Sequence, residues 1–122
     1  MPMALTPRAA QCYDRLVAAA RQEQRPAYSE VAGWLTPPLD MGNPAHRNEL
    51  SQLLGDIGTF EHAQGRPLLP AIVVYQQGGM PGPGFYELAQ RLGLYGGSKD
   101  ELAQLGFFVE EAKRVYAHWK RR

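Results

Sequence analysis

The chain has 122 residues, of which 44% are hydrophobic and 20% are charged, a composition typical of a folded globular protein and not of a disordered one. Its 13 basic and 12 acidic residues almost cancel, so net charge alone gives no reason to expect a nucleic-acid partner. The single cysteine, Cys12, excludes an intrachain disulfide and a cysteine-rich zinc site. Because no run approaches the roughly 20 apolar residues of a membrane span and no leader pattern opens the chain, we expect a cytoplasmic protein with one domain over residues 1–122 and no membrane partner.

The first half of the chain predicts three helices. The first begins at Thr6–Pro7, where a hydroxyl cap precedes a proline at the first helical position, and it continues to about Gln24. A short helix over 27–35 follows, and a third begins with a similar signal at Asn43–Pro44 and continues to about Ala63. Apolar residues three and four apart mark the buried sides of the first and third helices: Ala9, Cys12, Tyr13, Leu16, Val17, Ala20, Leu50, Leu53, Leu54 and Ile57.

The second half predicts one strand and two further helices. The continuous apolar run over 68–75 is typical of a strand that is buried on both faces. A short helix over 85–93 follows, and Ser98 with Glu101 three residues later forms a capping box that opens the last helical region. This order predicts a mostly α fold of the α+β class, namely a winged-helix-like helical domain with a small sheet or a single hairpin.

The loop that leads into the fourth helix is made of glycine, proline and methionine. Pro81 and Pro83 remove backbone N–H donors that a phosphate cradle would need. Their alternation with Gly82 and Gly84 fixes a sharply bent path, because proline restricts φ and glycine permits positive φ. We therefore predict a rigid structural turn from Pro81, Gly82, Pro83, Gly84 and Phe85, with the Phe85 ring packed beneath it.

The second and third predicted helices follow each other as in a helix-turn-helix, in which the later helix meets DNA. Arg47, Asn48 and Ser51 decorate the polar start of the third helix, and arginine and asparagine read guanine and adenine bidentately. Arg66 and Gln76–Gln77 would add contacts to the phosphate backbone. Double-stranded DNA is therefore the first predicted partner, bound by Arg47, Asn48, Ser51 and Arg66. The alternative is a plain helical hairpin, which a connection of about eight residues favours.

The segment Tyr28-Ser29-Glu30-Val31-Ala32 resembles the Thr-Tyr-x-x-Ala start found in the winged-helix domain of alkylguanine transferases and alkyltransferase-like proteins. The resemblance covers roughly residues 27–84 and implies a DNA-binding layout, in which Arg47 is the nearest counterpart of the family's DNA-inserting arginine. Pro70-Ala71-Ile72-Val73 stands where the family has its active-site segment. Since the reactive cysteine and the following His-Arg are missing there, alkyl transfer is excluded.

A second resemblance connects the chain to a set of small bacterial proteins of unassigned function. The matching pattern consists of Gly65–Leu69, Val73–Val74, Pro81–Phe85 and Leu88–Ala89. It implies membership in that set and no particular activity.

A protein partner is the competing prediction. A net charge near zero and a second half rich in aromatic residues favour this prediction. These are Tyr75, Phe85, Tyr86, Tyr95, Phe107, Phe108, Tyr116 and Trp119. In this hypothesis the chain is a regulator, an inhibitor or an assembly subunit that presents an aromatic and arginine-containing surface.

The sequence contains no local catalytic signature, such as Gly-x-Ser-x-Gly, His-Glu-x-x-His or a Walker-type Gly-Lys-Ser/Thr. We therefore expect no enzyme, no cofactor and no metal. His46 and His62 lie on the same predicted helix, about 24 Å apart at the usual rise per residue, so one ion could not join them. Cys12 falls on the apolar side of its helix, where a buried thiol is inert.

Overall fold

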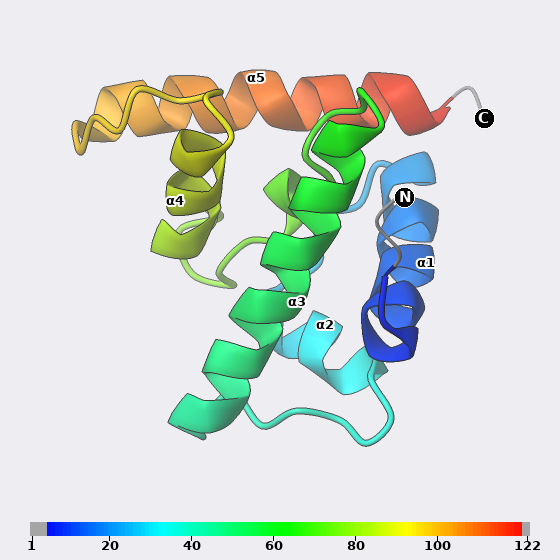
Figure 1. Cartoon of the computed structure of the whole chain (residues 1–122). Coiled ribbons are helices and arrows are strands. Elements are labelled where there is room, and N and C mark those ends of the chain that lie inside the picture. Colours follow the sequence, from blue (N-terminus) through cyan, green and yellow to red (C-terminus); the bar gives the residue numbers. More distant parts are fainter. Residues whose placement is uncertain (1–4, 121–122) are drawn as a thin grey trace.

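The computed structural model describes residues 5–120, which form five α-helices and one short 3₁₀ helix (Figure 1). In chain order the elements are α1 (Pro7–Arg21), α2 (Tyr28–Trp34), α3 (Pro44–Ala63), the 3₁₀ helix η1 (Leu69–Ile72), α4 (Pro83–Arg91) and α5 (Glu101–Lys120). The prediction of a mostly α-helical protein is confirmed. None of the helices within residues 5–120 has the length and apolar character needed to cross a membrane.

The helix starts follow the capping chemistry of the sequence. The Thr6 hydroxyl accepts a hydrogen bond from the Ala9 N–H at the start of α1, and the Asn43 side chain accepts one from Ala45 at the start of α3. At α5 the cap differs from the predicted capping box. The Asp100 carboxylate, and not the Ser98 hydroxyl, caps the helix by accepting a hydrogen bond from the Ala103 N–H at 3.1 Å. The Ser98 hydroxyl accepts one from the Asp100 N–H, before the helix begins.

The predicted strand over 68–75 is wrong. Its first half is the 3₁₀ helix η1, and the described residues contain no sheet, only a single parallel bridge between Ala27 and Val74. In that bridge Val74 accepts from the Tyr28 N–H and donates to the Pro26 carbonyl, both at 3.1 Å. The residues of this run are apolar because they are buried, and not because the backbone is extended. η1 packs against α1, α3 and α5 and is covered on all sides. Pro70 inside the run also fits the first turn of a helix better than a central strand.

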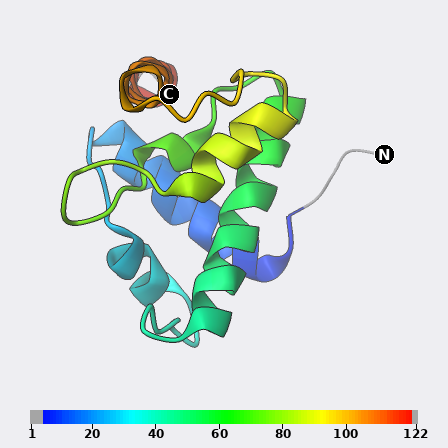
Figure 2. The same cartoon turned by 90° about the vertical axis from the view of Figure 1, so that its left-hand side faces the viewer.

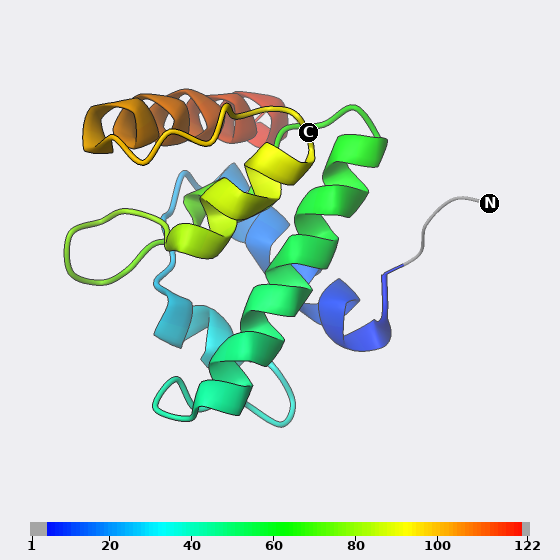
Figure 3. The same cartoon turned by 60° about the vertical axis from the view of Figure 1, so that its left-hand side comes forward.

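The helices are arranged as a bundle crossed by one long helix. α5 lies across the ends of α1, α3 and α4 in Figure 1 and is seen nearly end-on above them in Figure 2. α1 and α3 pack on each other and on η1, and α4 packs along the other side of α3 (Figure 3). The core between them is lined by Leu16, Val31, Leu50, Ile57, Leu69, Ile72 and Val115. This packing leaves one side of α3 partly open to solvent, namely the side that faces α2, α4 and the loop before α4.

The loop over residues 75–82, which we call the glycine–proline loop, projects from the body of the protein between η1 and α4 (Figure 3). It closes on itself through a hydrogen bond from the Tyr75 N–H to the Met80 carbonyl at 2.8 Å. Gly78 and Gly79 have φ of 87° and 64°, values that favour glycine over any other residue. The sharp bend therefore lies earlier than the predicted turn over Pro81–Phe85: Gly82 is the N-cap of α4 with a negative φ of −77°, and Pro83, Gly84 and Phe85 belong to the first turn of that helix. The Phe85 ring is buried, as predicted, and is 6% exposed.

Candidate functional site

Two adjoining cavities form a groove along α3. The first has a volume of about 480 Å³ and lies between α2, α3, α4 and the glycine–proline loop, and the second, of about 320 Å³, continues between α3 and α4. They share four lining residues, Ser51, Gly55, Gly84 and Glu87. We call the first the apolar cavity and the second the polar cavity, and the two together the groove.

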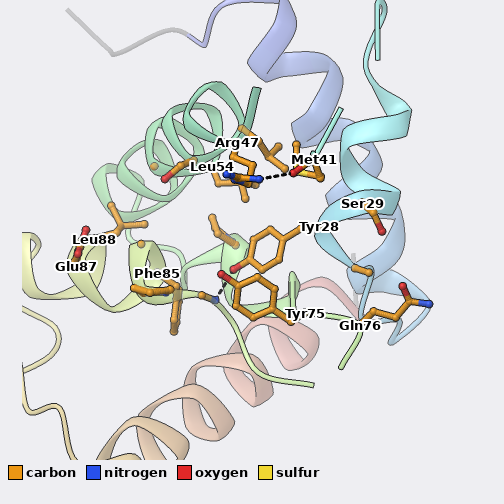
Figure 4. A pocket seen from close by; sticks show the side chains of 18 residues that line it. Tyr28, Ser29, Met41, Arg47, Leu54, Tyr75, Gln76, Phe85, Glu87 and Leu88 are labelled. Atoms are coloured by element: carbon orange, nitrogen blue, oxygen red, sulfur yellow. Dashed lines mark hydrogen bonds between the residues drawn. The ribbon is translucent and has the colours of Figure 1, made fainter. Parts of the chain in front are cut away.

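The walls of the apolar cavity come from segments far apart in the sequence. α3 contributes Leu50 and Leu54, α4 contributes Phe85 and Leu88, and η1 contributes Pro70. Figure 4 shows the Tyr28 and Tyr75 rings side by side on the facing wall, and their centroids are 4.9 Å apart with the rings tilted by 53°. The cavity is therefore a hydrophobic recess with an aromatic wall.

Tyr28, the first residue of α2, holds the glycine–proline loop in place. Its hydroxyl accepts a hydrogen bond from the Gly82 N–H at 2.7 Å, and burial raises the pKa of Tyr28 to about 12. A Cβ on Gly82 would lie 2.7 Å from the Tyr75 hydroxyl, so any other residue at this position would displace the half-exposed Tyr75 ring from the loop. Tyr28 thus connects α2, the loop and the start of α4 at one point of the wall.

Arg47 stands at the outer end of the apolar cavity. One guanidinium nitrogen donates to the Met41 carbonyl at 2.9 Å, and Figure 4 shows the side chain reaching over the cavity on the side opposite Tyr75. Among the described residues Arg47 makes no ion pair, and it is the one Lys, Arg or His in the lining of the apolar cavity. Its guanidinium therefore keeps N–H donors available to a ligand.

The polar cavity carries charges of both signs. Its lining includes Asp56 and Glu87 as acids and Arg91 as a base. The Gln52 amide donates to the Asp56 carboxylate at 2.9 Å, and Asn48 contributes a further exposed amide. Together with Arg47, the groove holds as many acidic as basic side chains, so it has no strong net charge.

The structure separates the four residues predicted to contact DNA. Arg47, Asn48 and Ser51 lie exposed on the first two turns of α3 and line the groove. Arg66 follows the opposite end of α3, beyond a helix of 20 residues that spans about 30 Å. One exposed surface patch therefore contains the first three and not Arg66.

Arg66 is occupied by contacts inside the protein. Its Nε donates to Oε1 of the fully buried Glu61 at 3.0 Å, and its guanidinium lies 5.6 Å from the Phe60 ring centroid and 5.9 Å from that of Trp119. The hydrogen bond from Arg66 to Glu61 raises the pKa of the guanidinium, and the Tyr13 hydroxyl donates to the same carboxylate oxygen at 2.9 Å. These contacts give Arg66 a structural role at the end of α3.

The residues suspected of metal or nucleophilic chemistry are dispersed. No group of three His, Cys, Asp or Glu able to hold a metal ion occurs in residues 5–120. His46 accepts a hydrogen bond through Nδ1 from the Asp40 N–H at 2.8 Å, and His62 lies exposed on the last turn of α3. Cys12 is fully buried, and burial raises the pKa of its thiol to about 12, which keeps it protonated and unreactive at neutral pH.

Sequence reasoning missed most of the groove. Met41, Leu54 and Gly55 were not singled out as site residues, because each also fits an ordinary core or loop position, whereas Tyr75 and Phe85 were named among the aromatic residues of a protein-binding surface. The available signal was Gly55 in the middle of a strongly predicted helix, since an interior glycine destabilises a helix and often marks a close approach or an open space. In comparisons with models of known protein families, with curated proteins and with solved structures, no match to this chain was found.

Proposed function

We propose that this chain is a protein-interaction module that binds a segment of a partner protein in the groove. The observation that carries the proposal is that the two cavities adjoin, because Ser51, Gly55, Gly84 and Glu87 line both of them. A hydrophobic recess beside a polar cavity suits a polypeptide, because one apolar side chain can be buried while the adjoining backbone and polar side chains stay partly solvated. A compact ligand would fill the apolar cavity alone and leave the polar cavity unused.

The composition of the groove supports a protein partner. Tyrosine, arginine, methionine and phenylalanine are enriched at the centres of protein interfaces, and the apolar cavity contains all four types. The mixed charges of the polar cavity suit a polypeptide with polar groups of both kinds, whereas a duplex would require an excess of positive charge.

Filling the groove tests the proposal. A random 12-residue peptide library displayed on phage is selected on the full chain, and labelled synthetic copies of the selected peptides are titrated by fluorescence polarisation. Gly55 lines both cavities and a Cβ there would meet only the Arg91 guanidinium at 3.8 Å, so Gly55→Met starts a side chain at the groove from a position where its Cβ is tolerated. Gly106→Met on α5 is the matched control, because a Cβ at Gly106 has no atom within 4 Å and the residue does not line the groove.

We expect Gly55→Met to weaken peptide binding at least about ten-fold and Gly106→Met to leave it unchanged. Recovery of no peptide, or of peptides that bind Gly55→Met as well as the unmodified chain, would overturn the proposal.

Duplex DNA is the second candidate, and the exposure of Arg47, Asn48 and Ser51 on one face of α3 favours it. In that arrangement, which resembles a winged helix, the start of α3 enters the major groove and the loop carrying Gln76–Gln77 takes the place of the wing. A gel-shift titration of duplex DNA at several salt concentrations tests it. Micromolar binding that weakens steeply with salt and is lost in Arg47→Gln supports this candidate, and absence of binding at low salt refutes it.

A further inference from the structure

We infer that the segment bound in the groove carries an aromatic side chain, which enters the apolar cavity, and a nearby Asp or Glu, whose carboxylate pairs with Arg47. This inference rests on the proposed function and specifies the chemistry of the partner. It follows from the aromatic wall, from the state of the single cation in the cavity and from the position of the acidic groups in the groove.

The apolar cavity suits an aromatic side chain. The Tyr28 and Tyr75 rings form one wall, and Tyr75 is 51% exposed although it is a large aromatic residue. Aromatic pairs with tilted or edge-on rings gain free energy beyond the burial of their area, and Tyr75 offers an uncovered ring for such a contact. Leu54 and Leu88 lie opposite and supply the apolar contacts that an inserted ring needs (Figure 4).

Arg47 supplies the charge that selects a carboxylate. Of the eight arginines in residues 5–120, three pair with a glutamate, namely Arg8 with Glu49, Arg66 with Glu61 and Arg114 with Glu111, and Arg47 is one of the five that make no ion pair. Arg47 instead makes a single hydrogen bond to the Met41 carbonyl, which fixes the guanidinium beside the cavity. A planar guanidinium held in this way presents its remaining N–H groups for a bidentate bond with a carboxylate.

An acidic side chain fits this position better than a phosphate or a chain terminus. Phosphorylated segments are recognised by clusters of arginines, and the apolar cavity is lined by one cation. Capture of a terminal carboxylate uses a series of backbone N–H groups, and the Arg47 guanidinium lies instead against a backbone carbonyl, that of Met41. The lining of the polar cavity has two acids, Asp56 and Glu87, and one base, Arg91, so an acid placed at that end of the segment would gain less than one placed beside Arg47.

The peptides selected in the display experiment provide the test. We expect them to contain Trp, Tyr or Phe with an Asp or Glu within about four residues, the reach of one extended peptide across the cavity. For one selected peptide, replacement of the acid by its amide should weaken binding to the unmodified chain about ten-fold, and should have no further effect on binding to Arg47→Gln. The Arg47→Glu variant should prefer the peptide in which the acid is replaced by lysine. Because Arg47 is exposed, circular dichroism should show that both variants fold.

The outcomes separate the inference from the function on which it rests. Selected peptides that bind in the groove, as shown by Gly55→Met, but that lack the aromatic and acidic pair would overturn the inference and leave the protein-interaction module standing. The same holds if the acid-to-amide change weakens binding to Arg47→Gln as strongly as to the unmodified chain. If no peptide is selected, both are overturned.

Discussion

The two ends of α3 hold two arginines in opposite situations. Arg66, just beyond the last turn, is bound to a fully buried carboxylate and lies near two aromatic rings. Arg47, in the first turn, touches one backbone carbonyl and borders an open cavity. The sequence presents both as exposed cations near polar neighbours. The fold distinguishes them, because it buries Glu61 beside Arg66 and packs Tyr13, Phe60 and Trp119 around it.

This difference shows that the surroundings of an arginine decide whether it stabilises the fold or can bind a ligand. Glu61 is buried and has no route to water, so its charge needs Arg66 and the Tyr13 hydroxyl at close range. No buried acid faces Arg47, and its removal leaves no charge uncompensated inside the protein. The end of α3 near Arg66 therefore contributes to folding, and the end near Arg47 is open to a ligand.

The largest expected effect is on folding stability at the Arg66 end. Arg66→Ala should lower the free energy of unfolding by about 2–3 kcal/mol, because it leaves the buried Glu61 carboxylate without its cation. The loss is smaller than for a fully buried ion pair, since the Arg66 side chain is partly exposed. Arg47→Ala, the matched control, should change it by less than about 0.5 kcal/mol. Urea denaturation followed by circular dichroism measures both. If both variants lost the same free energy of unfolding, Arg66 would contribute no more to folding stability than Arg47.

Two glycines of α3 should respond in opposite directions to alanine. A Cβ at Gly58 would fall inside the contact distance of Leu88 Cδ2, and Leu88 is 2% exposed and has little room to move. Gly58→Ala should therefore destabilise the protein by about 1–2 kcal/mol. Gly55→Ala meets only an ordinary contact with Arg91 and should stabilise the helix by about 0.5–1 kcal/mol. Thermal unfolding of the two variants gives the comparison, and a loss of stability in Gly55→Ala would mean that the groove is narrower than described.

A further effect concerns Tyr28 and depends on pH. Tyr28→Phe should cost about 1 kcal/mol at pH 8, because the Gly82 N–H loses its acceptor. Burial raises the pKa of Tyr28 in the folded protein from its ordinary 10.0 to about 12. The stabilisation by the neutral phenol is thus complete below pH 10 and is lost as pH rises towards 12. Because this loss reaches about 2–3 kcal/mol, more than the lost hydrogen bond, the advantage of the unmodified chain over the variant should shrink to zero and then reverse within that interval. Urea denaturation at pH 8, 10 and 11.5 measures it, and a constant difference would contradict the assignment.

The helices could be predicted because their signals are local. The caps Thr6 and Asn43 and the periodic apolar residues of α1 and α3 give helix starts that agree with the structure. The 3₁₀ helix η1 was predicted as a strand because a fully buried run is apolar at every position, whichever conformation it adopts. Its conformation is decided by α1, α3 and α5 around it, which no short window of sequence contains.

The groove was less accessible to prediction than the helices. Arg47, Asn48 and Ser51 were identified from the polar start of α3, and all three line the groove. Arg66 was grouped with them because its buried partner Glu61 reads as an ordinary surface glutamate in a helix. The apolar wall opposite Arg47 depends on the hydrogen bond from the Gly82 N–H to the Tyr28 hydroxyl. These two residues are 54 positions apart in the chain, so no local pattern predicts their contact.

Because the groove is assembled from α2, α3, η1, the glycine–proline loop and α4, it exists only while all of these elements are folded together. A ligand of the groove therefore binds the native state and not the unfolded chain, and at 100 times its dissociation constant it adds about 2.7 kcal/mol to the free energy of unfolding. A shift in melting temperature can thus reveal a ligand without any assay of activity. The same coupling allows a bound partner to compensate for a destabilising substitution elsewhere in the chain.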